Sequence, residues 1–270
     1  MKIRHYAGFF TIFFIITLYS SGIIFATAKI DTSRVSDGLA IYEYSGDLKK
    51  TAIALWLELS GGEKNTPTMN VSPSVLPMNL GTGTYTLRIL EKLPNGQGRP
   101  IVSESVELKT VPDEKIMYTA SNMNVDFEAS KTAIPSYKKL TDGLEGNDVI
   151  DKLYEDVINN YTYDHDKANA VTSGTLKGYL PVLDDVYAAK KGICFDYSAI
   201  LAGSLRSQGI PAKLCKGFAT DVGEYHAWNE ILVDGKWVVV DSTIDAAYVE
   251  VNKTPQFAKD ASKFKASSYF

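Results

Sequence analysis

The chain has 270 residues, of which 45% are hydrophobic and 22% are charged, and its formal net charge at pH 7 is −4. Because the charges are interspersed rather than gathered in blocks, the composition argues against a surface for binding nucleic acid. The length is sufficient for two domains, each with its own buried core.

The first 28 residues predict an export signal. Lys2 and Arg4 form a basic start, Phe9–Tyr19 is strongly apolar, and Ala26–Ala28 is an A-x-A cleavage site. The apolar stretch continues almost to that site and is nearly long enough to span a bilayer, so an uncleaved membrane anchor is the alternative. We therefore expect a secreted or cell-surface protein whose only contact with a membrane is this segment.

Residues 29–112 have the pattern of a small all-β sandwich. Short alternating or apolar runs are separated by Gly, Pro, Asn and Ser: Leu39–Tyr44, Thr51–Leu59, Thr84–Leu90 and Ile101–Leu108. The aromatic side chains of this domain could bind a polymer, but a domain that positions or stabilises the rest of the chain is the simpler interpretation. Helical periodicity replaces the alternation after Pro112, where we place the domain boundary.

Residues 113–270 form the second predicted domain, and its first clear helix is predicted over Asp148–Ile158. The apolar residues of that segment share one face, and Asn147 is the predicted N-cap. Two acidic clusters follow, Asp164-His165-Asp166 and Asp184-Asp185. Neither has the spacing of a metal site and both fit solvated loops, so we expect neither a metal nor another cofactor.

A second helix is predicted over Ile193–Gln208, because apolar residues recur there at helical spacing and Gly209 follows at the position of a helix end. Cys194 lies in the first turn of this helix. Unpaired backbone N–H groups and the positive end of the helix dipole favour a thiolate there, and Lys190 and Lys191 add positive charge. These features predict that Cys194 is a nucleophile rather than a cysteine that only packs.

The second cysteine, Cys215, lies in Ala212–Phe218, which has the pattern of a strand that follows the helix. In an exported chain, two cysteines raise the alternative of a disulfide between Cys194 and Cys215, which would abolish the nucleophile. A buried packing thiol suits the position of Cys215 better.

Two apolar runs, Tyr225–Val233 and Lys236–Thr243, flank Asp234-Gly235, which is the strongest short-range signal for a type I′ hairpin. The turn fixes the register between the two strands. In this register His226 and Asp241 are diagonal neighbours on one face of the sheet, within reach of a side-chain hydrogen bond.

The side chains of Cys194, His226 and Asp241 have the outline of a thiol acyl-transfer enzyme. In this arrangement His226 can take the proton of Cys194, while Asp241 holds the imidazole in the required tautomer and stabilises the imidazolium. The chain has only three histidines, and the other two lie in the export segment and in a polar loop, so few bases are available. Trp228, on the same face, is expected to shield the site and to pack beside the imidazole.

Several blocks of sequence closely resemble the transglutaminase-like core, a branch of the papain-like thiol enzymes. They occur in the family's order between about Asn147 and Asp241: Gly192–Ser198, Leu205–Ala212, His226–Glu230, Gly235–Trp237 and Asp241. The resemblance implies an α+β fold in which a nucleophile helix packs on an antiparallel sheet. It also implies Cys194 as nucleophile, His226 as acid and base, and Asp241 as the orienting residue.

An oxyanion hole is also implied by this resemblance, with the backbone N–H of Cys194 as one donor. In the family, the segment before the nucleophile often adds a second donor. Here that segment offers Tyr163, or Tyr161, where the animal cross-linking enzymes have an indole, and packing is the alternative role for either tyrosine. This departure argues against cross-linking.

Acyl-enzyme chemistry on an amide of a protein or peptide is the activity that the resemblance implies. The acyl group can pass to water or to an amine, and we expect water, as in a peptidase or amidase. The alternatives are protein cross-linking by amine transfer and a cell-surface binding module that keeps the fold but has lost the chemistry.

Overall fold

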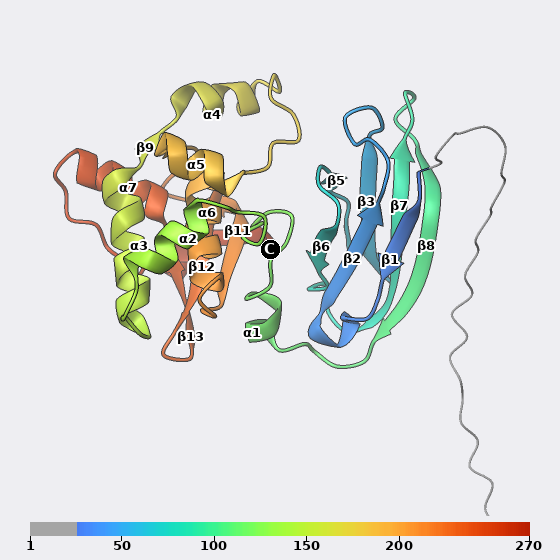
Figure 1. Ribbon diagram of the computed structural model, residues 1–270, viewed down its shortest axis with the longest axis horizontal. Coiled ribbons are helices and arrows are strands. Elements are labelled where there is room, and N and C mark those ends of the chain that lie inside the picture. Colours follow the sequence, from blue (N-terminus) through green and yellow to red (C-terminus); the bar gives the residue numbers. More distant parts are fainter. Residues whose placement is uncertain (1–25) are drawn as a thin grey trace, which may run out of the picture.

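The computed structural model of the protein describes residues 26–270, which form a β-sandwich followed by a mixed α+β domain (Figure 1). The predicted export segment, residues 1–28, therefore lies almost entirely outside the described residues. Within the described part of the chain, no helix combines the length and the apolar character needed to cross a membrane.

The N-terminal domain consists of two antiparallel sheets, with strand orders β1-β2-β6 and β4-β3-β7-β8, and β5 also pairs with β3. The strands are β1 (Ala28–Asp31), β2 (Leu39–Tyr44), β3 (Ile53–Leu59), β4 (Lys64–Asn65), β5 (Thr68–Met69), β6 (Ser74–Pro77), β7 (Gly83–Lys92) and β8 (Gly98–Leu108). Alternate residues such as Tyr42, Leu55 and Leu87 are fully buried between the sheets. The four strands predicted from the sequence correspond to β2, β3, β7 and β8.

The C-terminal domain places helices against a four-stranded antiparallel sheet of order β13-β12-β11-β14. The sheet strands are β11 (Ala212–Ala219), β12 (Glu224–Val233), β13 (Lys236–Val240) and β14 (Phe264–Tyr269), and the short strands β9 (Thr162–Tyr163) and β10 (Lys191–Gly192) pair apart from it. The helices are α1 (Glu114–Met117), α2 (Ala133–Leu140), α3 (Asn147–Asn160), α4 (His165–Thr172), α5 (Leu183–Ala189), α6 (Cys194–Arg206) and α7 (Ser242–Glu250).

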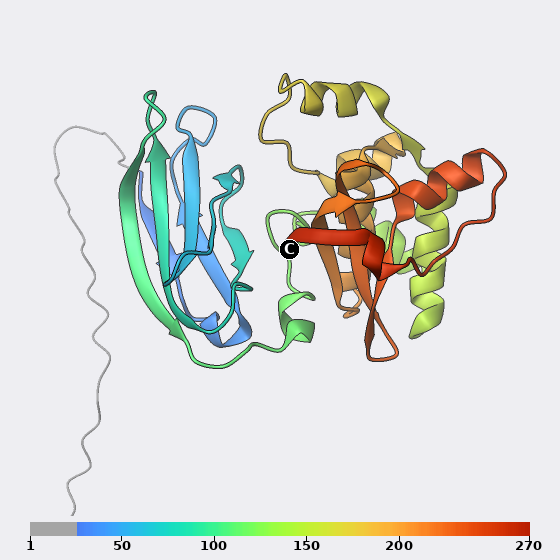
Figure 2. The ribbon, with the colours of Figure 1, turned by 180° about the vertical axis from the view of Figure 1, so that it is seen from behind.

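Helix α6 is the centre of this domain. It packs on β11 and β12 on one side and against α2, α3 and α5 on the other (Figures 1 and 2). Its side chains are buried along almost the whole length, because both sides are covered. The predicted arrangement of an α+β fold, with the cysteine-bearing helix packed on an antiparallel sheet, is therefore confirmed.

The prediction that Asn147 caps helix α3 is wrong. The N-cap is Gly146, whose φ of 56° lies in the left-handed region that favours glycine, and Asn147 is the first helical residue. The Asn147 amide instead donates to the carboxylate of Asp234 at 3.3 Å, which joins the start of α3 to the β12–β13 turn.

The β12–β13 hairpin has the predicted register, with Val233 paired with Lys236. Asp234 and Gly235 both have positive φ, at 49° and 78°, as a type I′ turn requires. The prediction that the second strand continues to Thr243 is wrong. Strand β13 ends at Val240, because the next residue is the N-cap of helix α7.

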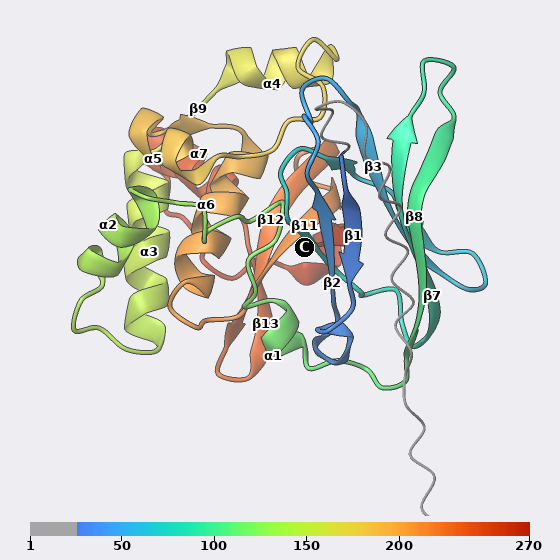
Figure 3. The same ribbon diagram turned by 45° about the vertical axis from the view of Figure 1, so that its right-hand side comes forward.

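Apolar residues and hydrogen bonds join the two domains where β2 and β6 approach β13 and β14. Figure 3 shows the two domains side by side. Leu39 of the sandwich packs in one cluster with Tyr118 and Trp237. The Asn79 amide donates to the carbonyl oxygen of Tyr269 at 2.8 Å. The sandwich is therefore packed on the C-terminal domain rather than attached by the linker alone.

Arg206, at the end of α6, is 2% exposed and binds three backbone carbonyl oxygens. Its Nε donates to Ala212 at 2.7 Å, one terminal nitrogen donates to Ala120 at 2.9 Å, and the other donates to Phe270. Burial lowers the pKa of this guanidinium to about 9. One side chain thus holds the start of β11, the segment after α1 and the segment after β14 together.

Candidate functional site

The first turn of α6 presents Cys194 as its first residue. The N–H of Cys194 has no acceptor within the helix, since the first N–H groups of any helix lack one. The buried carboxylate of Asp196 accepts the N–H of Ile193 at 2.8 Å. This bond closes the helix start at which Cys194 lies.

Asp196 is also held from the outside, by Lys167 Nζ at 2.9 Å and by the hydroxyl of Tyr179. These residues lie on α4 and on the loop after it. A Cβ at Gly192 would lie 2.4 Å from Asp196 Cβ, so this carboxylate can close over the helix start only because residue 192 is glycine. Asp196 was not predicted as a site residue, although an acidic residue three positions after the N-cap was a usable signal.

His226 and Asp241 are in direct contact, as the hairpin register predicted. His226 Nε2 lies 2.8 Å from Asp241 Oδ2, and the two side chains are 5% and 0% exposed. The other carboxylate oxygen, Oδ1, accepts the backbone N–H groups of Thr243 and Ile244 and so caps α7. The cap fixes Asp241, and Asp241 in turn fixes the imidazole.

The charge state of His226 follows from these contacts. Burial lowers the pKa of His226, but hydrogen bonds to Asp241 and Cys194, with the negative charges of both groups, outweigh burial and raise the pKa to about 10. The imidazole therefore holds its proton at neutral pH. With Asp241 on Nε2, the second nitrogen remains for the thiol, an arrangement suited to a thiolate–imidazolium pair.

Trp228 packs beside the imidazole as predicted, with the two rings nearly parallel at 19° and their centroids 6.5 Å apart. The indole is 1% exposed and lies among Cys215, Val239 and Phe264. It therefore covers one side of the site but offers no surface to a ligand.

The two candidate tyrosines occupy different positions. Strands β9 and β10 are parallel and pair Tyr163 with Gly192, two residues before Cys194. Burial, together with the charge on Cys194, raises the pKa of Tyr163 to about 12, so its hydroxyl remains a donor. Tyr161 points into the core, where its hydroxyl lies 2.7 Å from that of Tyr137. Of the two, only Tyr163 is beside the nucleophile.

The alternative of a disulfide is wrong, because Cys194 and Cys215 are both free thiols. Cys215 is fully buried beneath Trp228, and burial raises its pKa well above the ordinary value. Asp164 caps α4, and Asp184 binds the N–H groups that open α2. The two acidic clusters thus have structural roles in the described chain, although solvated loops were predicted.

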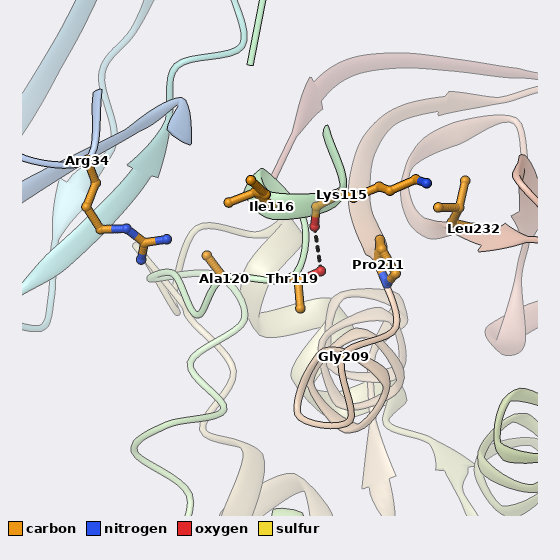
Figure 4. A pocket seen from close by; sticks show the side chains of 8 residues that line it. All are labelled: Arg34, Lys115, Ile116, Thr119, Ala120, Gly209, Pro211 and Leu232. Carbon is orange, nitrogen blue, oxygen red and sulfur yellow. Dashed lines mark hydrogen bonds between the residues drawn. The ribbon is translucent and has the colours of Figure 1, made fainter. Parts of the chain in front are cut away.

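A cavity of about 620 Å³ lies at the other end of α6, where it is lined by Arg34, Lys115, Gly209 and Pro211 among others (Figure 4). Helix α6 has 13 residues, so about 20 Å of helix separates this cavity from Cys194. None of the site residues predicted from the sequence lines it.

The part of the chain that carries Cys194, His226 and Asp241 is similar to known proteins. Residues 120–242 match the family model of the transglutaminase-like superfamily. A UPF0252 protein of Methanocaldococcus jannaschii is 26% identical over 117 residues, which are 40% of this chain and 33% of that protein. The match thus spans about a third of the length of that curated relative.

Two solved structures are also similar. A proposed cysteine protease from Cytophaga hutchinsonii is 14% identical, with a TM-score of 0.40 and 81% of each chain covered. The transglutaminase of red sea bream is 14% identical, with a TM-score of 0.29, over 76% of this chain and 48% of that one.

Proposed function

We propose, from the match of residues 120–242 to the transglutaminase-like superfamily, that the protein is an exported thiol hydrolase that cleaves amides of proteins or peptides. The observation that carries the proposal is the buried His226–Asp241 pair beside a cysteine at a helix start. A structural cysteine needs neither partner. The predicted signal in residues 1–28 is the reason for placing the activity outside the cytoplasm.

The proposed reaction starts from a thiolate–imidazolium pair, in which the thiol proton of Cys194 is already held by His226. The sulfur attacks the amide carbonyl carbon, and the negative charge that develops on oxygen is stabilised by the N–H of Cys194 and the hydroxyl of Tyr163. His226 then gives its proton to the departing amine, leaving a thioester on Cys194. Water then attacks the thioester while His226 takes one of its protons; the sulfur leaves as the thiolate and the acid is released, which restores the thiolate–imidazolium pair.

Transfer to water rather than to an amine is supported by the surroundings of Trp228. An acceptor lysine would need an open channel beside this indole, but the indole is enclosed by Cys215, Val239 and Phe264. Water needs no such channel.

A protein or peptide substrate is supported by exposed aromatic side chains next to the site. Phe218 and Tyr225, which are 50% and 64% exposed, are cross-strand partners directly after the pair formed by Gly217 and His226. Exposed apolar surface at a reactive group suits a polypeptide with apolar side chains.

The proposal is tested by incubating the protein with a mixture of denatured proteins in water labelled with heavy oxygen, with a labelled primary amine added, and analysing the products by mass spectrometry. We expect new carboxyl groups that carry heavy oxygen, and no products with Cys194→Ala or His226→Ala. Incorporation of the amine would show cross-linking chemistry instead. Absence of both products in the wild-type protein, with Cys194 unreactive toward iodoacetamide, would support a binding module.

A further inference from the structure

Lys216 lies on β11, with its side chain directed toward α6 rather than toward solvent. Its Nζ is 3.4 Å from the centroid of the Phe195 ring. The ammonium donates to the amide oxygen of Asn124 at 3.1 Å, and the ring of Phe270 is 5.0 Å away. An aromatic face and an amide oxygen therefore hold this cation in place.

Other partly buried lysines of this domain are paired with carboxylates: Lys167 with Asp196, Lys213 with Glu114 and Lys259 with Asp245. For Lys216, no carboxylate oxygen of residues 26–270 lies within 4.0 Å of Nζ. An ammonium in such a place is costly unless another negative charge compensates for it.

The contacts of Lys216 place it close to the nucleophile. Phe195, under the ammonium, directly follows Cys194 in the first turn of α6. On the neighbouring strand, Lys216 is paired with Ala227, which directly follows His226. The ammonium thus lies over the residue that follows the thiol, and its strand is the neighbour of the strand that carries the imidazole.

The groups that contact Lys216 are uncharged. Ala227 on β12 and Ser268 on β14 are uncharged partners in the sheet, and Asn124 and Phe270 are neutral at their contact atoms. Burial lowers the pKa of Lys216 to about 7, and the negative charge on Cys194 opposes this effect.

We propose that Lys216 is a positioning residue of the site, whose ammonium stabilises the thiolate of Cys194. The inference rests on the proposed function, because it requires Cys194 to be a nucleophile. The thiol proton is held by His226, and Lys216 neither gains nor loses a proton in the reaction. Two cations, the His226 imidazolium and the Lys216 ammonium, then share the stabilisation of one thiolate.

The test is the pH dependence of iodoacetamide labelling at Cys194, read by peptide mass. In Lys216→Met, which keeps the apolar contact with Phe195, we expect the labelling midpoint to rise by about one pH unit, a tenfold slower reaction on the acidic side. Lys216→Arg should restore the wild-type midpoint because it keeps the charge. Lys265→Met, which removes an exposed cation from the neighbouring strand, should leave the midpoint unchanged.

Thermal unfolding separates this role from a structural one. Removing an unpaired cation from an apolar contact should leave the unfolding temperature of Lys216→Met equal to or above that of the wild type. A lower unfolding temperature with an unchanged labelling midpoint would overturn the inference. If Lys216→Met does not fold, Lys216→Gln provides the same comparison of midpoints.

Failure of the proposed function gives a different result. In that case Cys194 of the wild-type protein would label slowly at mildly acidic pH, and the inference about Lys216 would fall with it. Fast wild-type labelling with no effect of Lys216→Met or Lys216→Gln would overturn only the role of Lys216.

Discussion

Replacing Asp241 with asparagine tests how the site holds the proton of His226. In the structure Asp241 accepts with both oxygens: Oδ2 faces the imidazole, and Oδ1 faces the N–H groups of Thr243 and Ile244. Asparagine has only one acceptor oxygen, and its NH₂ group would face donors on the other side. Asp241→Asn must therefore give up either the cap of α7 or the bond to the imidazole.

The magnitude follows from the pKa of His226, which lies at about 10 instead of the ordinary 6.5. That difference corresponds to about 5 kcal/mol in favour of the imidazolium, shared mainly between Asp241 and Cys194. If Asp241 supplies about half of it, the pKa of His226 in Asp241→Asn falls to about 8. Loss of the cap of α7 would cost about 1 kcal/mol of stability.

The pH dependence of folding has a defined sign. Because the folded-state pKa of His226 is raised, its contribution to the free energy of unfolding is complete below about pH 6.5 and is lost as the pH rises toward about 10. In Asp241→Asn this loss should be smaller and should end near pH 8. Urea denaturation at several pH values measures the change.

The direct assay is titration of the His226 imidazole by nuclear magnetic resonance, with His226→Ala used for assignment. Asp260→Asn is the matched control, because Asp260 also accepts a backbone N–H, from Ser262, but does not contact a histidine. A His226 midpoint in Asp241→Asn within about half a pH unit of the wild type would refute the reasoning.

Three further predictions concern single side chains. Tyr163→Phe should lower kcat by about tenfold to a hundredfold while leaving the pH profile of Cys194 labelling unchanged, because it removes only an oxyanion donor; equal kcat values would exclude that role. Arg206→Met should lower the free energy of unfolding by about 3 kcal/mol in urea denaturation, because carbonyl oxygens lose their donor; a loss below about 1 kcal/mol would contradict this account. Gly217→Ala should lower the unfolding temperature much more than Gly98→Ala. A Cβ at residue 217 would lie 2.1 Å from the backbone oxygen of Lys265, whereas a Cβ at residue 98 meets only a movable leucine side chain. Similar unfolding temperatures of the two variants would refute this prediction.

Local signals were sufficient to predict the parts of the site that depend on neighbouring residues. The Asp234-Gly235 turn alone sets the register, and the register places His226 near Asp241. Helical spacing and Gly209 were likewise sufficient to place Cys194 at a helix start. Both features arise within about fifteen residues, where backbone geometry decides the outcome.

Contacts between distant segments could not be predicted in the same way. Nothing in the polar run Phe264–Tyr269 indicates that it pairs with β11, since its partner lies about fifty residues earlier and its alternation is weak. The cap on α7 was missed although Asp241-Ser242-Thr243 is a usual helix start, because the preceding valines favoured a longer strand. Lys216 was missed because the sequence of an apolar strand that contains one lysine does not show which helix residues will pack against that lysine.

The contacts of Arg206 and the position of β14 have a consequence for the order in which the chain becomes active during synthesis. Cys194, His226 and Asp241 all leave the ribosome before Phe264–Tyr269, so every proposed reacting group exists while one edge of β11 is still bare. Until β14 arrives, Gly217, the cross-strand partner of His226, lacks its other neighbour, and the Arg206 guanidinium lacks the Phe270 carbonyl. We therefore expect the chain to carry an unassembled nucleophile until β14 pairs with β11.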